Sequence, residues 1–393
     1  YPVLFHVMLF FRKGKVKKVV QGLLFFFFLF VLVFVPGCWD YTDIDDQSVP
    51  IIGIYDLADL PNTEEKGIKV TGIFPVLHPE AEEKSRIDDI TGRSVAETRE
   101  KRNASDPEVL EIGLLQAGIF GEALARKGLQ EVTDNLLRDP MCKNTLVVGV
   151  MEGNTEEIFK LKIKNYPNPG LYLFELLKDP EKTSFLPTTT LHQFGVQKFA
   201  AGKNPIVPLL QIKNSSLVSI SGTGIFRKDK LIAKIGLAET RSLLLLRGPE
   251  SSGHIDYTLT ENGKVIDQGS MLVKASRKVK VMRQGNDFTF FITIGIKGKI
   301  LGHTSTLYFL DTKNTIPFDK IEQVVKNQIE RECRSFVEKM QNEFQVDCID
   351  ISKYALAKWR KELEDKVEQK SFIKNAKIMI DVKVKVLNVG ELT

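Results

Sequence analysis

The segment that most constrains this chain lies near its start. Nearly every residue from Val19 to Val35 is apolar, and the last part, from Leu23 onward, contains only Leu, Phe and Val. Five bases precede it without any acid: Arg12, Lys13, Lys15, Lys17 and Lys18. A basic stretch followed by an apolar stretch is typical of an export signal. The apolar run of about 17 residues also reaches the lower limit for a membrane-spanning helix, so a retained anchor is the alternative.

The residues that follow the apolar segment favour cleavage. Val35-Pro36-Gly37-Cys38 resembles a bacterial lipobox, in which a small residue precedes a cysteine that is lipidated and becomes the new N-terminus. Pro36 is unusual at its position, whereas Val35 and Gly37 fit. The sequence therefore predicts a signal peptide over residues 1–37 and a lipid on Cys38, with the retained anchor as the alternative. Two acyl chains would be enough for stable anchoring.

The chain after the signal segment is electrically neutral. Without the five bases of that segment, the 55 Lys and Arg fall to 50, which equals the 50 Asp and Glu. A neutral chain lacks the positive surplus typical of nucleic-acid-binding proteins, so we expect no nucleic-acid partner. With 393 residues the chain is longer than one ordinary domain, and 43% hydrophobic residues are normal for a globular protein.

The first folded unit is predicted over residues 38–210. The patterns predict a strand hairpin from 49–57 and 68–77, and a strand at 145–151 that is buried on both faces. Helical spacing of apolar residues occurs in five further segments: 107–124, 129–137, 155–163, 171–177 and 186–202. The charged stretch 80–106 predicts an exposed, mobile connection or a frayed helix rather than a functional loop.

The second unit is predicted over residues 211–393, with a possible division near residue 250. A hairpin at 216–235 and a helix at 239–246 precede five strand patterns: 254–260, 265–268, 272–282, 287–296 and 304–310. A helix over 318–344 carries one continuous apolar stripe that includes Phe336, and a second helix covers 351–369. Strand 377–387 alternates apolar and mostly charged residues, so helices should cover one face. The predicted fold is α+β and multi-domain, with central, mostly antiparallel sheets, packed helices and an N-terminal lipoprotein signal.

No catalytic or metal-binding pattern is recognisable in the sequence. The histidines are scattered, and neither a nucleophile elbow nor a P-loop occurs. We therefore expect no enzyme activity, no cofactor and no metal. The basic run Lys274 to Arg283 predicts the solvated face of a strand, with binding of anionic headgroups or an acidic partner as the alternative. Cys142, Cys333 and Cys348 form no disulfide framework, although one bond would be possible.

Several blocks resemble, in the correct order, the Ger(x)C lipoproteins of spore germination. The N-terminal ones are Gly37-Cys38-Trp39-Asp40, Asp139-Pro140 and Gly202 to Pro208. The most recognisable ones are Gly222 to Leu231, Glu239-Thr240-Arg241 and Arg247-Gly248, and Trp359 with strand 378–386 resembles the C-terminal end. Departures occur at Pro36, Asp43, Tyr55 and Cys348-Ile349-Asp350.

The resemblance implies a non-enzymatic subunit of a nutrient germinant receptor. Such a subunit is anchored by lipid on the outer face of the inner spore membrane, beside two integral membrane partners. It leaves open whether the subunit contacts the small-molecule germinant. The candidate interface residues are Trp39, Asp40, Glu239, Arg241 and Trp359. The alternative is an extracytoplasmic solute-binding lipoprotein, which needs two lobes and a cleft lined by polar groups and aromatics.

Overall fold

The computed structural model describes residues 25–27, 30, 47–76, 85–161, 163, 165–178, 185–248, 250–303 and 318–389. The chain divides into two compact units, residues 1–47 and 48–393, and nearly all described residues belong to the second. Cys38, Trp39 and Asp40 lie outside the described residues, as does the predicted strand 304–310. Among the helices that are described, none combines the length and the hydropathy needed to cross a membrane.

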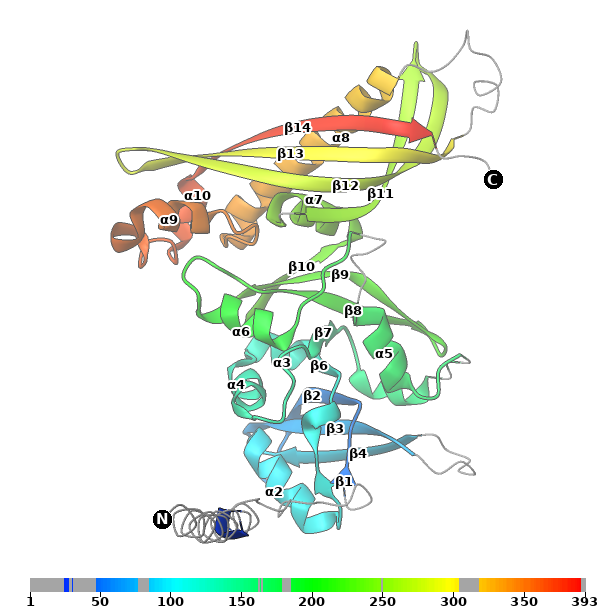
Figure 1. Cartoon of the computed structure of the whole chain (residues 1–393), viewed down its shortest axis with the longest axis vertical. Helices are drawn as coiled ribbons and strands as arrows, with labels where there is room; N and C mark the ends of the chain where they lie inside the picture. Colours follow the sequence, from blue (N-terminus) through cyan, green and yellow to red (C-terminus); the bar gives the residue numbers. More distant parts are fainter. Residues whose placement is uncertain are drawn as a thin grey trace, which may run out of the picture. The chain divides into compact units, whose positions relative to one another are not determined.

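Eight strands of the second unit form one mixed sheet (Figure 1). In chain order they are β2 (Ile52–Asp59), β3 (Lys66–Pro75), β4 (Ser85–Gly92), β6 (Ala117–Gly121), β7 (Val147–Met151), β8 (Ile206–Asn214), β9 (Leu217–Arg227) and β10 (Lys230–Gly236). Their order across the sheet is β10-β9-β8-β7-β6-β2-β3-β4. The four middle strands β8, β7, β6 and β2 are parallel, and the outer pairs are antiparallel. The predicted hairpins β2–β3 and β9–β10 are confirmed.

Helices cover both faces of this sheet. One face packs against α2 (Val95–Ser105), α3 (Glu122–Lys127), α4 (Gln130–Arg138) and α6 (Leu191–Phe199). The other face packs against η3 (Thr155–Lys160) and α5 (Pro169–Lys178). In β7, Val148 and Val150 point to the first cluster and Met151 to the second, and the whole strand is buried. The prediction of a strand covered on both faces is therefore confirmed, as are the helices at 129–137 and 171–177.

Two predictions for the N-terminal half are wrong. The charged stretch 80–106 contains β4 and α2, and Ser94 caps the helix by accepting from the N–H of Glu97. Arg102 is buried there and pairs with Asp106 at 2.9 Å and Asp88 at 3.2 Å. These ion pairs order a segment that has too few apolar residues to be recognised from its pattern.

The helix predicted over 107–124 does not form. The segment contains the short strand β5 (Val109–Leu110), the 3-10 turn η2 (Ile112–Leu114) and β6. Every residue of β6 is buried. A strand buried on both faces is apolar at every position, so it also satisfies helical spacing, and the pattern could not separate the two structures. Another short strand is β1 (Gln47–Ser48).

A second sheet of four strands lies in the C-terminal part. It has the order β11 (Glu250–Glu261), β12 (Lys264–Gln284), β13 (Asp287–His303) and β14 (Lys377–Val389). The β13–β14 pair is parallel and the others are antiparallel. The strands predicted at 265–268 and 272–282 are one strand, β12, whose pairing with β13 shifts register between Ser270 and Met271. This irregularity interrupts the sequence pattern.

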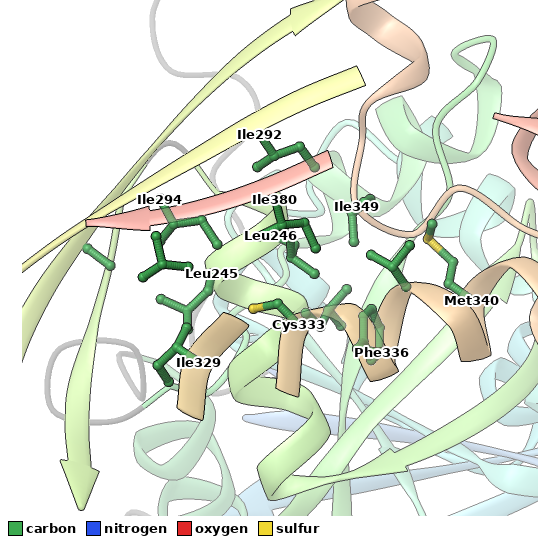
Figure 2. Close-up of a cluster of buried hydrophobic side chains, with 14 of the residues drawn as sticks. Leu245, Leu246, Ile292, Ile294, Ile329, Cys333, Phe336, Met340, Ile349 and Ile380 are labelled. Carbon is green, nitrogen blue, oxygen red and sulfur yellow. The ribbon is translucent and has the colours of Figure 1, made fainter. Parts of the chain in front are cut away.

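Helices cover one face of the four-stranded sheet. They are α7 (Leu237–Arg247), α8 (Phe318–Lys339) with the π-helical continuation Met340–Phe344, α9 (Ser352–Leu363) and α10 (Lys370–Asn375). Figure 2 shows Ile292, Ile294 and Ile380 of the sheet above Leu245 and Leu246 of α7 and the α8 side chains. Phe336 belongs to the same buried cluster. The predicted packing of the long helix on the C-terminal sheet is confirmed, and so is the α+β, multi-domain fold.

The single helix predicted over 351–369 is wrong in its second half. α9 ends at Leu363, and Trp359 inside it has the non-helical angles φ −133° and ψ 39°. A separate helix, α10, follows. The amide of Gln341 donates to the carbonyl oxygens of Ile373 at 2.8 Å and Ala376 at 2.7 Å, so a distant side chain caps the end of α10.

The division of the mature chain at residue 210 stays a prediction. That position lies within β8, which pairs with β7 on one side and β9 on the other. The eight-stranded sheet continues to Gly236, α7 follows, and the four-stranded sheet begins at Glu250. One apolar cluster joins Ile206, Ile225 and Ile235 of the first sheet to α7 and the second sheet.

Candidate functional site

Helix α7 contains two of the predicted interface residues, and backbone packing fixes where it begins. Gly222 of β9 lies so close to β10 that a Cβ atom there would approach the carbonyl oxygen of Ile235 to 1.9 Å. The next residue, Thr223, hydrogen-bonds to the buried Thr240 of α7 at 2.9 Å. The block that most resembles the Ger(x)C family is thus a close contact between a hairpin and a helix.

Glu239 and Arg241 of α7 both form ion pairs with α8. The Nζ atom of Lys339 lies 2.7 Å from Oε1 of Glu239, and Nη2 of Arg241 lies 2.7 Å from Oε2 of Glu332. Burial raises the pKa of the neighbouring Cys333 thiol to about 12, and the charge of Glu332 adds to this. Both candidate residues therefore have partners within the chain, about 90 to 100 positions away, which the sequence could not identify.

Trp359, another candidate interface residue, lies at the kink of α9 and is half-buried. Its ring meets that of Phe288 in β13 edge to face, with centroids 5.8 Å apart. The guanidinium of Arg283, which also pairs with Glu362 at 2.6 Å, lies 5.8 Å from the Trp359 ring. Trp359 therefore holds the kinked helix against the end of the β12–β13 hairpin. The roles of Glu239, Arg241 and Trp359 in an interface stay predictions.

A buried polar cluster joins the end of α7 to both sheet regions, and the sequence analysis did not assign it a role. Arg247 is 8% exposed and donates to the carbonyl oxygens of Cys348 at 2.5 Å and Asn204 at 3.1 Å. It also pairs with Asp350 at 3.3 Å. The side-chain amide of Asn204 donates to the carbonyl oxygen of Asp347 at 3.2 Å. Two blocks of the family resemblance, Gly202 to Pro208 and Arg247-Gly248, contain members of this cluster and are the signals for it in the sequence.

Arg277 belongs to the same cluster, so the prediction that the basic run 274–283 is a solvated strand face is wrong at this position. It is 8% exposed and lies on the covered face of β12. Its guanidinium donates to the carbonyl oxygens of Leu246 and, at 2.6 Å, Ile349. Lys274, Lys278 and Lys280 of the run are exposed, as expected.

The segment after α8 is held by the carboxylate of Asp347. It accepts hydrogen bonds from the N–H groups of Ile349 at 3.1 Å, Ile351 at 3.3 Å and Ser352 at 2.7 Å. Burial raises the pKa of Asp347, and the nearby charge of Asp350 acts in the same direction. The hydrogen bonds oppose this shift but do not outweigh the loss of solvent.

A depression of about 1250 Å³ lies beside this cluster. Its walls come from the segment 185–190, α6, the end of α7, the start of β11 and the strands β12 to β14. Its lining contains six bases and two acids: Arg247, Lys274, Lys297, Lys353, Lys383 and Lys385, with Glu250 and Asp350. We call this depression the lysine groove. Phe185 is the single aromatic residue in its lining.

The register of the sheet brings three lysines of the groove into one row. Lys274 of β12 pairs directly with Lys297 of β13, and Lys297 pairs directly with Lys385 of β14. Lys383, two residues before Lys385, is paired with Gly295. All four lysines are exposed, and they lie on the face of the sheet opposite to α8.

Cys142, Cys333 and Cys348 are free thiols. Burial raises the pKa of Cys142 to about 11 and that of Cys348 still further. Over the ranges described, no group of three or more His, Cys, Asp or Glu side chains is placed to hold a metal ion.

Two successive parts of this chain match domains of a known protein family. Residues 40–212 match the family described as spore germination protein N-terminal domain, and residues 221–390 match the spore germination B3/GerAC-like C-terminal domain. The chain therefore belongs to the Ger(x)C family of spore germination proteins, as the sequence resemblance predicted.

Individual relatives agree with this family. The chain is 22% identical over 316 residues to the spore germination protein GerQC of Bacillus cereus, a match that covers 79% of this chain and 84% of the relative. It is 21% identical over 329 residues to the putative spore germination protein YfkR of Bacillus subtilis (strain 168), covering 80% and 82%. The crystal structure of the GerBC protein has a similar fold, with a TM-score of 0.54 at 15% identity, covering 88% of this chain and 100% of that one.

Proposed function

We propose that this protein is a lipid-anchored subunit of a spore nutrient germinant receptor that acts by assembly and signalling contacts with integral membrane partners. The observation that carries the proposal is the match of two successive domains, residues 40–212 and 221–390, to spore germination proteins. The basic and apolar segment before Cys38 supports export and lipid attachment. The proposed location is the outer face of the inner spore membrane.

The proposed mode of action is contact rather than turnover. A catalytic site needs a nucleophile or base in hydrogen-bond reach of a group that orients it. The buried polar side chains of the described cluster are instead engaged with backbone groups: Arg247 and Arg277 donate to carbonyls, and Asp347 accepts from N–H groups. Such an arrangement supports a structural role for the cluster.

The solute-binding alternative fits the lysine groove less well. A small-molecule site is lined mainly by apolar and aromatic side chains with a few converging polar groups. The groove contains six bases spread along its lining and a single aromatic residue, and its volume exceeds the usual upper value of about 1,000 Å³ for such sites. The apolar cluster that runs through α7 also ties the two sheets together, whereas binding-protein lobes need a hinge.

Lipid attachment can be tested by labelling spores or cells with an acyl-chain analogue. We expect the wild-type chain to be tagged and Cys38→Ala to be untagged, because Cys38 is the only cysteine that follows the apolar segment directly. Cys142→Ala is the matched control and should be tagged normally. Equal tagging of Cys38→Ala would contradict the anchor, and loss of partner subunits in a strain without this protein would support the assembly role.

The role of Arg241 in docking can be separated from its role in the fold. Arg241→Glu places a carboxylate beside Glu332, so it should weaken the packing of α7 on α8. The double variant Arg241→Glu/Glu332→Arg restores the ion pair and should restore the unfolding midpoint. If Arg241 also contacts a partner, co-purification of the other receptor subunits stays impaired in the double variant. Full recovery of co-purification would assign Arg241 to the fold alone.

A further inference from the structure

The row Lys274–Lys297–Lys385 is unfavourable for the isolated chain. Neighbouring strands lie about 4.8 Å apart, and like charges directly opposite one another destabilise a sheet. Among the described residues, Lys274 and Lys297 form no ion pair, and Lys385 is paired only with Glu322 of α8 at 3.4 Å. Nothing in the packing of the fold requires lysine at these exposed positions, so the row suggests an anionic partner.

The same sheet face carries further lysines and exposed apolar side chains. Lys278, Lys280 and Lys299 are exposed on this face, and the acids that β12, β13 and β14 place on it are Asp287, at the hairpin end, and Asp381. Lys280 is paired with Phe291, which is 39% exposed, and Phe291 with Met379, which is 45% exposed. An exposed patch that mixes apolar and basic side chains is typical of a binding surface.

The shape of the groove favours an extended chain as the occupant. The row crosses three strands, a span of about 10 Å. The groove continues to Arg247 at the end of α7 and to Lys353 of α9. A polypeptide in extended conformation advances about 3.3 to 3.6 Å per residue, so three or four residues span the row, and their acidic side chains need not match the strand spacing because lysine side chains are long and flexible. Lysine binds carboxylates as a point charge and places few demands on their geometry.

Addition of a partner strand to the β14 edge is a less suitable mode of binding. The N–H groups of Val382 and Val386 on this edge donate to Glu330 at 3.2 Å and Glu322 at 2.9 Å. Two of the edge donors that a new strand would need are therefore occupied. A partner would therefore bind to the charged side chains on the open face of the sheet and not to the strand edge.

The position of the groove favours a protein over a bilayer. Ser48 is the first residue of the compact unit and follows the proposed lipid site Cys38 in the chain. Its hydroxyl oxygen accepts hydrogen bonds from Arg86 and Arg102 beside β4, at one edge of the eight-stranded sheet. The groove reaches β8 at Ile206 and passes Thr190, which bridges to Val147 of β7, so it lies four to five strands from β4. At about 4.8 Å per strand this separation is roughly 20 Å. A concave surface also makes fewer contacts with a bilayer than with a chain.

We propose that the lysine groove binds an extended acidic segment of a partner protein through Lys274, Lys297, Lys383 and Lys385. This proposal rests on the proposed assembly role, because that role identifies the partner as another receptor component. The groove would hold the segment across β12, β13 and β14, with the carboxylates neutralising the row of lysines. The excess of bases over acids in the lining then becomes stabilising in the complex.

The test uses the chain from residue 38 with Cys38→Ser, which retains the whole compact unit from Ser48 to Thr393. The probe is a fluorescein-labelled Glu-Ser repeat of about twelve residues, long enough to cross three strands. A Gln-Ser repeat of equal length is the neutral control. Fluorescence anisotropy gives Kd, measured at low salt and again at about 0.15 M salt, where screening weakens exposed charge contacts.

Two triple variants remove the same number of charges. Lys274→Gln/Lys297→Gln/Lys383→Gln changes the groove, and Lys361→Gln/Lys366→Gln/Lys370→Gln changes exposed lysines around the end of α9 and the start of α10 that do not line it. We expect the groove variant to bind the acidic peptide at least tenfold more weakly and the control variant to stay within twofold of wild type. All six side chains are exposed, so both variants should fold, which thermal unfolding checks.

Three outcomes would overturn the proposal. They are equal weakening in the two triple variants, equal affinity for the Gln-Ser repeat, and a groove-dependent interaction with phosphatidylglycerol vesicles in place of the peptide. The test is independent of the assembly role. The groove could bind the peptide while the receptor assembles normally in a strain without this protein. That combination would reject the proposed function and leave the binding proposal for the groove supported.

Discussion

Arg247 in α7 donates a hydrogen bond of 3.1 Å from Nη2 to the carbonyl oxygen of Asn204, which precedes β8. The same guanidinium donates to the carbonyl oxygen of Cys348 after α8. One buried side chain therefore connects the eight-stranded sheet, the central helix α7 and the segment that leads into α9. This contact, together with the apolar cluster around α7, joins the two sheets into one compact unit.

Replacement of Arg247 by Met should destabilise the whole unit. The change leaves the buried carbonyl oxygens of Asn204 and Cys348 without this donor and Asp350 without its ion pair. Breaking a buried ion pair by removing one partner costs about 3 to 5 kcal/mol. Urea unfolding measures the loss. Arg360→Met, at an exposed position of α9, is the control and should leave the midpoint nearly unchanged.

Phe336→Ala should lower the free energy of unfolding by about 3 to 5 kcal/mol, because the change leaves a cavity between α8 and the four-stranded sheet. Phe336 is 3% exposed and lies 6.4 Å from Phe344, measured between ring centroids. Phe199→Ala is the matched control, since Phe199 is 66% exposed. Similar midpoints for Phe336→Ala and wild type would show that this face of α8 contributes little to the core.

Lys297→Thr should keep or raise stability while it weakens acidic-peptide binding. The lysine stands between two others in its row, so its removal relieves repulsion on both sides, and Thr favours strands. We expect a gain of about 0.2 to 1 kcal/mol in the free energy of unfolding. Lys213→Thr, at an exposed strand position in β8, is the matched control. A clear loss of stability in Lys297→Thr would mean that the lysine has a structural role.

Stability should depend on pH through Asp347. Its pKa is raised in the folded state, so between the ordinary value and the raised one the folded chain holds a proton that the unfolded chain has lost. Stability from this group therefore falls as pH rises through that window, which begins near pH 4. Unfolding midpoints at about pH 5 and about pH 8 measure the effect. In Asp347→Asn the difference between the two midpoints should shrink.

Cys142, Cys333 and Cys348, the free thiols of the described residues, should react slowly with thiol reagents in the native protein. Only the thiolate is nucleophilic, and a pKa of about 11 leaves roughly one Cys142 in a thousand ionised at pH 8. Cys333 and Cys348 are also fully buried. Reaction with a chromogenic disulfide should be fast only after unfolding. In the chain with Cys38→Ser, rapid labelling of the native protein would indicate that one of the three lies at a mobile site.

Local patterns predicted most of the elements that have one buried face. β14 and α8 show why. Each repeats its apolar residues with the period of its own backbone, so the spacing of these residues predicts which side is covered. The same reasoning failed for β6, where both faces are covered and no period remains. It also failed for α2 and β4, where ion pairs replace apolar burial.

The sequence by itself determined the export and lipid-attachment prediction, the α+β class and the family, because these depend on composition, short-range periods and ordered motifs. Only the tertiary structure decided the partners of Arg247 and Arg277 and the row Lys274–Lys297–Lys385. Those contacts join residues between about 20 and 100 positions apart, and strand register and helix packing select them. A charged residue looks the same in the sequence whether it meets water, a buried carbonyl or another lysine.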